Sequence, residues 1–500
     1  MDWEKFVDLS VTDAPRISVT PPGPRSLEIL KIQEELEGSA VSYPRGMPMA
    51  LARGRGATLE DVDGNVYIDC FSGAGVMALG HAHPYVLEAA HGQLDKVTHT
   101  LDIPSETRMR LVKVLGRILP AELSRVFFGG PTGSDAVEQA IKLARFNTRR
   151  DGIIVFEGAY HGMTGASLAA TSDSGHKDGI GSLTPGFQFL PFPYRYRNPF
   201  GCPEEKVDEF AADNLERVLD DTHSGYSKPA AVLLEAVQGE GGTIIPGPLF
   251  LQRVREITKA RGILLICDEI QCGLGRTGKM FAFEHSGIVP DIVTMSKALG
   301  GAGFPISAIA FREELNTLPP GKSIGTFRGN MVAFAAGAAG LEWMIENRVP
   351  EYAAQLGEKA MTRFREMEKG SRILGEARGI GLMIALEIVE DKKTRKPAAD
   401  LTKQLRKLAH QRGVMIEVGG HHNNVARLLP PLVISEAHLM KAADILEGVL
   451  KDLEGGLAAV SSGGGGVSPL KPAPAPPPVF RGYGRGGSLT SRSVRSRGTG

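Results

Sequence analysis

The segment SRVFFGGPTGSDAVEQAIKLAR, residues 124–145, combines a strand, a glycine turn and a helix in direct succession. SRVFF is a short apolar run of the kind found in buried strands. After the turn, four apolar residues recur at helical spacing: Val137, Ala140, Ile141 and Ala144. The first turn of such a helix offers backbone N–H groups and a positive dipole end, which favour an anion. We predict an anion-binding turn with Gly133 and Ser134 as donors, with a plain helix cap by Thr132 or Ser134 as the alternative.

Similar apolar runs continue along the chain and alternate with helical segments. These runs are GIIVF (152–156), AAVLLEAV (230–237), GILLICDE (262–269), DIVTMS (291–296) and ISAIAF (306–311). Continuous apolar strands separated by helices are typical of a mostly parallel sheet that helices cover on both faces. The predicted fold class is therefore α/β.

Changes in pattern divide the rest of the chain. A short amphipathic helix is expected at 25–37, and Asp63-Gly64 suits a tight hairpin turn. One long helix is expected after Ala333, followed by GLMIALEIV and GVMIEV (413–418) as strands among helices. The predicted parts are an N-terminal arm with a helix (1–40), a β-rich segment packing with the small domain (41–75), a large domain (76–333), a smaller α/β domain (334–454) and a disordered Gly/Ser/Pro/Arg tail (455–500).

Charge and composition exclude several classes of protein. Lys+Arg and Asp+Glu number 57 each, but residues 455–500 hold six basic side chains and no acid, so 1–454 carry a net charge of −6. Neither an acidic body nor so sparsely charged a tail predicts nucleic-acid binding. Four cysteines are too few for a disulfide scaffold, and the acidic N-terminus does not resemble a signal peptide. With no run near the ~20 apolar residues of a membrane span, we expect a cytoplasmic protein.

Two polar residues lie at the ends of predicted strands. Asp268 ends one strand, and Lys297 directly follows another. Carboxyl ends of parallel strands meet at one edge of a sheet, where α/β proteins bind ligands. Burial there would lower the pKa of the lysine and favour the neutral amine that imine chemistry needs. The plain alternative is a structural aspartate and a surface lysine.

These residues, taken together, match the needs of one cofactor. Pyridoxal 5′-phosphate (PLP) requires a lysine for its covalent link, a carboxylate beside its pyridine nitrogen and an anchor for its phosphate. The aromatic Tyr160 lies at the end of a further strand. His161, next to it, fits either a buried structural histidine or a support for the site. Each residue alone is equivocal, but the combination predicts a PLP enzyme.

Two other motifs invite different chemistry. GLGRTG (273–278) satisfies G-x-G-x-x-G, but a dinucleotide site must open directly into a helix, and little room for one follows. A nicotinamide-dependent dehydrogenase therefore stays a distant alternative. His81, His83 and the adjacent His421 and His422 lack a third ligand at suitable spacing, so we assign no metal.

Eight blocks in order resemble the class III aminotransferases, the ornithine/ω-amino acid type of PLP fold type I, over about residues 42–446. The blocks are GHAHP, TGSDAVEQAIKLAR, FEGAYHG, EAVQGEGG, DEIQCGLGRTG, SKALGG, GTFRGN and RLLPPLVI. The resemblance implies a large and a small α/β domain. It also implies ping-pong transfer of an amino group between an amino acid and 2-oxoglutarate through a lysine Schiff base. A PLP-dependent racemase or epimerase of the same fold stays open, because it removes the same proton.

The resemblance also implies roles in holding the cofactor. Lys297 matches the Schiff-base lysine and general base, and Asp268 matches the partner of the pyridinium nitrogen. Gly133 and Ser134 match the phosphate cup, Tyr160 the aromatic residue stacked on the ring, and Gln271 the amide near the phenolic oxygen.

Three further residues match positions that serve the substrate or the second subunit. Thr326 matches a threonine that reaches the phosphate of a neighbouring subunit, which implies a homodimer or a dimer of dimers with shared active sites. Arg427 matches an arginine that grips a substrate carboxylate, and Glu240 a glutamate that occupies or releases it.

Departures from the wider family point to a subgroup. Asp135 stands where many relatives have Glu, and Arg328 where many have Gly. The blocks TGSDAVE and TFRGN look like the subgroup that includes diaminobutyrate:2-oxoglutarate aminotransferases. 2,4-Diaminobutyrate, or a related diamino acid, is therefore the expected amino donor.

Overall fold

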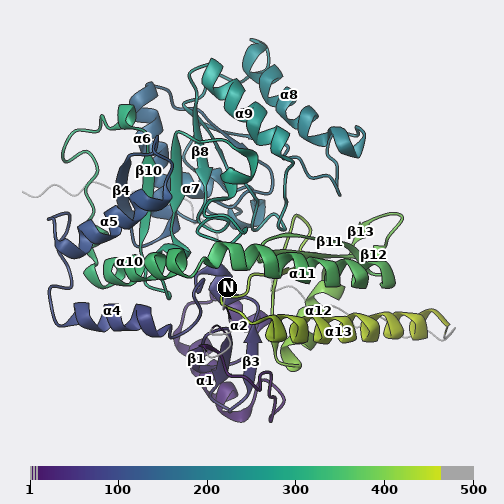
Figure 1. Cartoon of the computed structure of the whole chain (residues 1–500). Helices are drawn as coiled ribbons and strands as arrows, with labels where there is room; N and C mark the ends of the chain where they lie inside the picture. The colour runs from purple at the N-terminus through teal and green to yellow at the C-terminus, as the bar shows by residue number, and fades with distance from the viewer. Residues whose placement is uncertain (1–2, 4–5, 7–8, 463–500) are drawn as a thin grey trace, which may run out of the picture. The chain divides into compact units, whose positions relative to one another are not determined.

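A seven-stranded sheet carries the predicted motifs in the computed structural model, which describes residues 3, 6 and 9–462 (Figure 1). Its strands, in spatial order, are β4 (Arg125–Gly130), β10 (Ser307–Phe311), β9 (Ile292–Met295), β8 (Leu264–Asp268), β7 (Ala231–Leu234), β5 (Ile153–Phe156) and β6 (Phe187–Leu190). β10 is antiparallel to both neighbours, and the pairs from β9 to β6 are parallel. The predicted mostly parallel sheet is confirmed; β6 is a strand that the apolar runs did not reveal.

Helices cover both faces of this sheet, so its strands are apolar throughout. In β5, Ile153 and Val155 belong to a buried cluster with α6 (Gly133–Thr148), whereas Ile154 and Phe156 belong to one with α9 (Pro248–Ala260). The Phe156 ring packs edge-on against Phe250 of α9 at 5.5 Å. Successive side chains of a strand point to opposite faces, and here both faces are buried. The remaining helices of this region are α7 (Gly165–Ala170), which packs on α6, and α8 (Val207–Asp220), which packs on α9.

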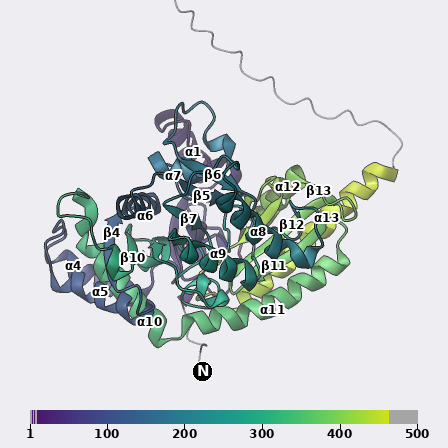
Figure 2. The same ribbon diagram turned by 90° about the horizontal axis from the view of Figure 1, so that it is seen from above.

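The long helix expected after Ala333 is two helices, α10 (Met331–Glu346) and α11 (Val349–Gly370). The break lies at Arg348, whose positive φ of 51° ends the helical path, and Pro350 stands in the first turn of α11. Figure 2 shows α10 grouped with α4 (Pro84–Leu94) and α5 (Glu106–Ile118), against which it packs.

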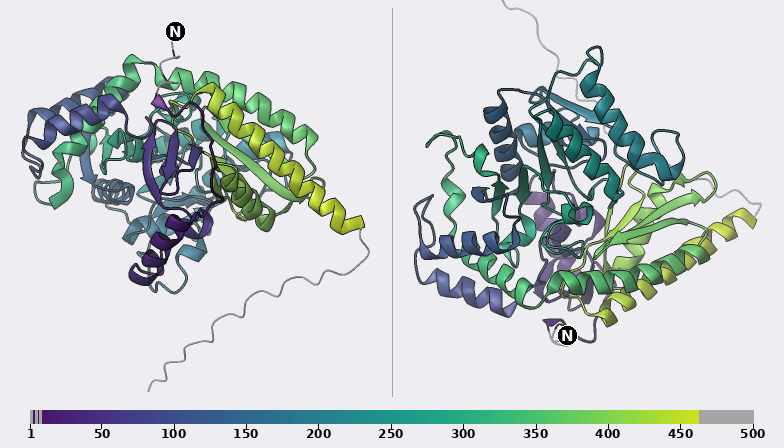
Figure 3. Two further views of the ribbon diagram at one scale, coloured as in Figure 1. Left: turned by 90° about the horizontal axis from the view of Figure 1, so that it is seen from below. Right: turned by 45° about the horizontal axis from the view of Figure 1, so that its top comes forward.

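A second sheet lies between the later helices. Its strands are β11 (Leu374–Ile380), β12 (Met383–Asp391), β16 (Val425–Leu428) and β15 (Glu417–Gly419) in spatial order, with β13 (Lys396–Pro397) paired to β12. Its helices are α12 (Ala399–Gln411) and α13 (Glu436–Ser462). Figure 3 shows α13 beside α11, where Arg363 lies 3.1 Å from Asp444.

A third, smaller sheet joins the N-terminal region to this part of the chain. It contains β1 (Leu51–Arg55), β2 (Thr58–Asp61), β3 (Val66–Asp69) and β14 (Val414–Met415). The expected hairpin turn at Asp63-Gly64 is confirmed, and so is the N-terminal helix, as α1 (Pro24–Leu36). Two single-turn helices, α2 (Tyr43–Gly46) and α3 (Ser72–Gly75), flank the sheet strands in the sequence.

One predicted strand, 413–418, is divided between two sheets. β14 pairs in parallel with β3, whereas β15 begins at Glu417 and pairs with β16. The predicted disordered tail begins too early, because residues 455–462 belong to α13, and the rest of that tail, 463–500, lies outside the described residues. None of the helices described is long and apolar enough to cross a membrane.

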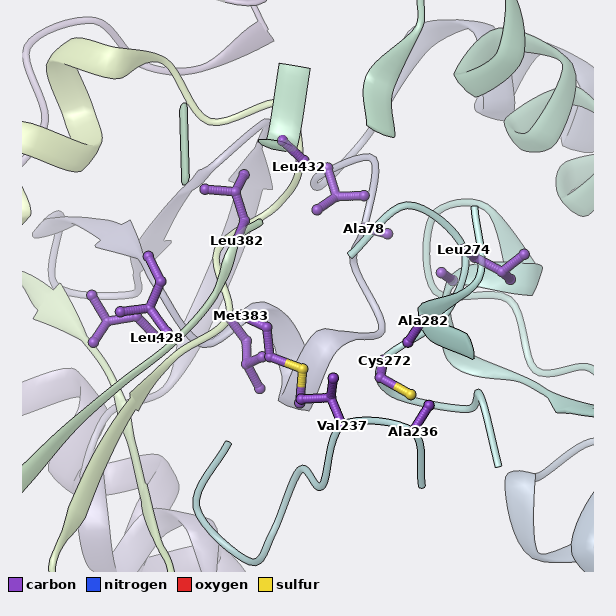
Figure 4. Close-up of a cluster of buried hydrophobic side chains, with 14 of the residues drawn as sticks. Ala78, Ala236, Val237, Cys272, Leu274, Ala282, Leu382, Met383, Leu428 and Leu432 are labelled. Atoms are coloured by element: carbon purple, nitrogen blue, oxygen red, sulfur yellow. The ribbon is translucent and has the colours of Figure 1, made fainter. Parts of the chain in front are cut away.

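Side chains from three parts of the chain pack together close to the carboxyl edge of the large sheet (Figure 4). The labelled residues are Ala78, Ala236, Val237, Cys272, Leu274, Ala282, Leu382, Met383, Leu428 and Leu432. Beside them, the buried guanidinium of Arg276 donates to the carbonyl oxygens of Leu382, at 3.1 Å, and Pro430. These contacts fix the strands of the second sheet relative to the loops that follow β7 and β8.

Candidate active site

A cavity of about 230 Å³ lies at the carboxyl edge of the seven-stranded sheet. Every predicted site residue except Arg427 and Thr326 lines it. The strand order explains this convergence, because β8 and β9 are parallel neighbours with Asp268 opposite Thr294. The loops after β5 and β7 and the start of α6 reach the same edge. The sequence expectation that Asp268 and Lys297 share one crevice is therefore met by the fold.

Asp268 is a buried carboxylate with three hydrogen-bond partners. Its Oδ2 lies 2.7 Å from Nδ1 of His161, and its Oδ1 accepts from the hydroxyl of Thr294 at 2.9 Å and from the N–H of Ile270 at 3.1 Å. A carboxylate only accepts hydrogen bonds, so Nδ1 of His161 carries the proton. His161 therefore supports the site directly, which its sequence position left open.

Thr294 was missed by sequence reasoning. It stands in the middle of the apolar run DIVTMS, and a lone hydroxyl in a buried strand was the available signal.

The predicted anion cup lies at the start of α6, where Thr132 is the N-cap. The Thr132 N–H donates to Oδ2 of Asp135 at 2.9 Å, so this acid closes the cap. The hydroxyl of Ser134 accepts instead from the N–H of Met163 at 3.2 Å. The N–H groups of Gly133 and Ser134 belong to the first turn, where the helix offers no acceptor, and they line the cavity.

The loop after β5 fits closely over this turn. Gly162 has a φ of 128°, and a Cβ there would lie 2.3 Å from Oγ of Ser134. Only glycine combines that backbone conformation with so close an approach. The loop therefore brings Tyr160 and the start of α6 to the same cavity.

Lys297 follows β9 and has a φ of 46°, a left-handed conformation that is unusual for a residue with a side chain. Such strain is found where a surrounding structure fixes a functional group. Burial lowers the pKa of the Lys297 amine, while Glu240 and Glu417 act in the opposite direction. The balance favours the neutral amine more than solvent would.

Arg427 is fully buried on β16 and is shared by two carboxylates. Its Nη2 lies 2.5 Å from Glu240 and 2.6 Å from Glu417, and its Nη1 donates to Oε1 of Gln271 at 3.3 Å. Burial opposes the charge, but the two acids raise the pKa of Arg427. The predicted pair of Glu240 and Arg427 is thus in contact. Glu417 was missed, and its signal was an acid inside the apolar run GVMIEV.

Glu235 is a second buried acid that sequence reasoning missed. Its two oxygens accept from the backbone N–H groups of Tyr160, at 3.1 Å, and Gly239, at 2.8 Å. It therefore joins the loop that bears Tyr160 to the loop that bears Glu240. The pKa of Glu235 is raised to about 7. Burial is the main cause, His161 acts in the opposite direction, and Asp268 adds to the rise.

Thr326 is not brought to the other predicted residues. It begins a short 3-10 helix (Thr326–Gly329), is exposed, and its carbonyl oxygen lies 2.7 Å from Nε2 of His99. Thr326 lines neither this cavity nor a second, larger cavity that adjoins it and is described below. A role for Thr326 therefore requires a second copy of the chain.

GLGRTG does not form a dinucleotide site. Residues 273–278 form consecutive turns, and the next helical segment is a short 3-10 helix at Ala282–Ser286. The fingerprint needs a long helix whose N-terminus points at the pyrophosphate. The dehydrogenase alternative lacks this element.

A larger cavity of about 900 Å³ adjoins the first, and Tyr160, Glu240 and Lys297 line both. Its wall also includes Glu417 and Arg406. The smaller cavity therefore offers a place for a flat ring with an anionic tail, and the larger one a place for a charged substrate.

Comparison with known proteins decides the family. The family model described as "Aminotransferase class-III" matches residues 40–450 of the chain. The chain belongs to the class III aminotransferases. It is 42% identical over 433 residues to the diaminobutyrate–2-oxoglutarate aminotransferase of Rhizobium meliloti (strain 1021), covering 84% of this chain and 92% of that protein.

Two further proteins are similar to this class III aminotransferase, one by sequence and one by structure. The alanine/serine racemase of Pyrococcus horikoshii is 34% identical over 454 residues, covering 89% of this chain and 94% of that protein. The PLP-bound amine transaminase from an uncultivated Pseudomonas species is 28% identical with a TM-score of 0.77, covering 84% of this chain and 98% of that one. The fold is therefore PLP fold type I, and the enzyme is a transaminase that uses PLP.

The residues present fit this cofactor. A first helical turn with available N–H groups suits a phosphate, the buried Asp268 suits a protonated ring nitrogen, and Lys297 suits the link to an aldehyde.

We predict that replacing Glu235 changes how stability depends on pH. The folded protein holds this proton up to about pH 7, while the unfolded chain loses it near pH 4.5. The folded state therefore binds more protons between these values, and the free energy of unfolding falls as pH rises through them. Glu235→Gln removes this loss. The melting temperature of the variant minus that of the wild type should therefore be larger at pH 8 than at pH 5. The exposed Glu157→Gln is the control, and an equal difference at both pH values for Glu235→Gln would contradict the assignment.

Proposed function

We propose that this class III aminotransferase moves an amino group from 2,4-diaminobutyrate, or a related diamino acid, to 2-oxoglutarate. The observation that carries the proposal is the buried Arg427, closed by Glu240 beside Lys297. An arginine that can be covered or exposed lets one site accept both an amine donor and a dicarboxylic oxo acid. The similarity to a diaminobutyrate–2-oxoglutarate aminotransferase supports this choice of substrates.

The chain's own groups divide the work of proton transfer. The bound cofactor supplies an electron sink that stabilises the carbanion formed at the substrate carbon. Lys297 lies at the junction of the two cavities, where its amine would take the proton from that carbon and hold it for return. Asp268, held by His161 and Thr294, would be the partner of the cofactor's ring nitrogen.

Other residues orient the reacting groups. The first turn of α6 at Gly133 and Ser134 would hold the cofactor phosphate, and Tyr160, which lines the same cavity, would contact the ring. Gln271 donates to the carbonyl oxygen of Ala74 at 3.1 Å and accepts from Arg427, so its amide is fixed at the cavity wall, where it would serve the ring oxygen of the cofactor. When the oxo acid enters, Glu240 releases Arg427, which then holds a carboxylate in a charge-assisted pair.

We also propose a homodimer or a dimer of dimers. Five apolar side chains around the loop that carries Thr326 are strongly exposed: Val97, Leu101, Ile103, Ile324 and Phe327. Backbone hydrogen bonds from Thr100 to Gly329 and from Met331 to Thr98 hold the two segments together. Contiguous apolar surface of this kind marks an interaction site, and a second copy would place Thr326 at the partner's phosphate. The four free cysteines fit the reducing cytoplasm.

Racemisation is a second candidate, because the alanine/serine racemase relative covers most of this chain. It needs the same proton removal but no oxo acid. A single enantiomer of alanine or of 2,4-diaminobutyrate, incubated without any oxo acid, should keep its optical rotation. Loss of rotation in that mixture, with no amino transfer when 2-oxoglutarate is added, would replace the proposed function.

We predict that Lys297→Ala abolishes amino transfer while the protein stays folded. Loss of the general base alone should lower kcat by about 10²- to 10⁴-fold, and loss of the covalent link should lower it further. Glutamate formed from 2-oxoglutarate measures the rate, and circular dichroism checks the fold. Borohydride treatment of the wild type, followed by peptide mapping, should find the cofactor on Lys297. Near-normal turnover in the variant would refute this role.

We predict that Arg427→Ala weakens the oxo-acid half of the reaction. A lost charge-assisted pair should raise KM for 2-oxoglutarate about 10- to 100-fold. The exposed Arg412, which pairs with Asp452, offers a matched control in Arg412→Ala. An unchanged KM for 2-oxoglutarate in Arg427→Ala would argue against the gate.

A further inference from the structure

The larger cavity is lined by an arginine, Arg406, for which the described part of the chain supplies no ion-pair partner. Arg406 projects from α12 and lines the cavity. Its Nε is buried without a hydrogen-bond partner, and no carboxylate of the described residues lies within 4.0 Å of its guanidinium. The buried Arg427, in contrast, is held by two acids. Arg406 therefore has hydrogen-bonding capacity that a ligand in this cavity would satisfy.

Packing holds this guanidinium in place. A Cβ added at Gly46, at the end of α2, would lie 2.4 Å from Cζ of Arg406, so the group lies flat against that backbone. Burial lowers the pKa of Arg406, and Glu417 is the acid that acts against this shift. A cation that is fixed, partly desolvated and unpaired is well suited to take a carboxylate.

Glu417 supplies the complementary charge in the same cavity. Arg427 carries one positive charge, yet Glu240 and Glu417 both bind its Nη2. Burial raises the pKa of Glu417, Arg427 acts in the opposite direction, and the neighbouring Glu240 raises it further. The cavity wall therefore offers Glu417, which shares its arginine with a second acid. It also offers Arg406, which forms no ion pair with a carboxylate of the described residues.

From this arrangement we propose that Arg406 and Glu417 together bind the zwitterionic end of the donor, Arg406 taking its α-carboxylate and Glu417 its α-ammonium. The inference rests on the proposed function and adds the residues that select the substrate. The far end of a diamino acid is then the end directed to Lys297. The terminal amino group passes to 2-oxoglutarate, which becomes glutamate, and the terminal carbon of the donor becomes an aldehyde.

Three amino donors test the two proposed contacts separately, because two of them each lack one charged group of 2,4-diaminobutyrate. 2,4-Diaminobutyrate has both the carboxylate and the second ammonium. 4-Aminobutyrate keeps the carboxylate but lacks the α-ammonium, and 1,3-diaminopropane keeps two ammonium groups but lacks the carboxylate. All three present a primary amine on a terminal CH₂. The measured quantity is kcat/KM for each donor with saturating 2-oxoglutarate, using the holoenzyme.

Arg406→Met should lower kcat/KM about 10- to 100-fold for 2,4-diaminobutyrate and 4-aminobutyrate, and leave 1,3-diaminopropane unchanged. Glu417→Gln should lower kcat/KM for the two diamines about 10-fold more than for 4-aminobutyrate, because any effect through Arg427 is common to all three donors. Arg406→Lys should recover part of the loss. Lys407→Met is the control on the same helix, because Lys407 is exposed and lines neither cavity. The absorption spectrum of bound cofactor should match the wild type in every variant.

The outcomes distinguish this inference from the proposed function. Equal losses of kcat/KM on all three donors would show that these residues act only through Arg427 or the fold. The same holds if a raised KM for 2-oxoglutarate accounts for the whole defect of Glu417→Gln. That result overturns the inference while diaminobutyrate remains a substrate. A wild type that transfers amino groups from other donors but not from 2,4-diaminobutyrate overturns the proposed function instead. Proton NMR of the product should show an aldehyde or its hydrate; a 2-oxo acid would place the α-amine at Lys297 and contradict the inference.

Discussion

The active site depends on keeping one carboxylate ionised inside the protein. Asp268 ends β8 at 3% exposure, and burying an unpaired charge is costly. Three donors offset that cost, and two of them, the His161 ring and the Thr294 hydroxyl, come from other strands or their loops. The register that places Thr294 opposite Asp268 is therefore as important for the chemistry as the acid itself.

The second requirement is that distant parts of the chain hold their charges at the same cavity. Arg427 belongs to the second sheet, whereas Glu240 and Gln271 belong to loops of the large one. The apolar cluster of Figure 4 and the hydrogen bonds of Arg276 tie these parts together. A rotation between the sheets would separate Arg427 from both loops. The packing of apolar side chains thus sets the geometry of the ion pairs.

Sequence patterns revealed the groups that stand at strand or helix ends. Asp268, Lys297 and the turn at Gly133 follow apolar runs, so periodicity alone predicted their common edge. Thr294 and Arg406 lie inside regular elements, where a lone hydroxyl in an apolar strand is a weak local signal and an arginine on a helix is none. Their importance arises from partners or cavities formed by residues far away in the sequence. The division of 413–418 between two sheets has the same cause, because strand pairing is a property of neighbours and not of the run itself.

The two acids on Arg427 are not equivalent, and the fold indicates which of them can move. Glu417 is the cross-strand neighbour of Arg427 in the β15–β16 pair, and its side chain is 9% exposed. The pairing of β15 with β16 holds its backbone in place. Glu240 lies in the loop after β7, and its side chain is 36% exposed. A change of rotamer in that loop costs far less than breaking a buried strand pair. Exchange between donor and oxo acid can therefore proceed by movement of Glu240 alone, while Glu417 keeps its place beside Arg406 throughout the cycle.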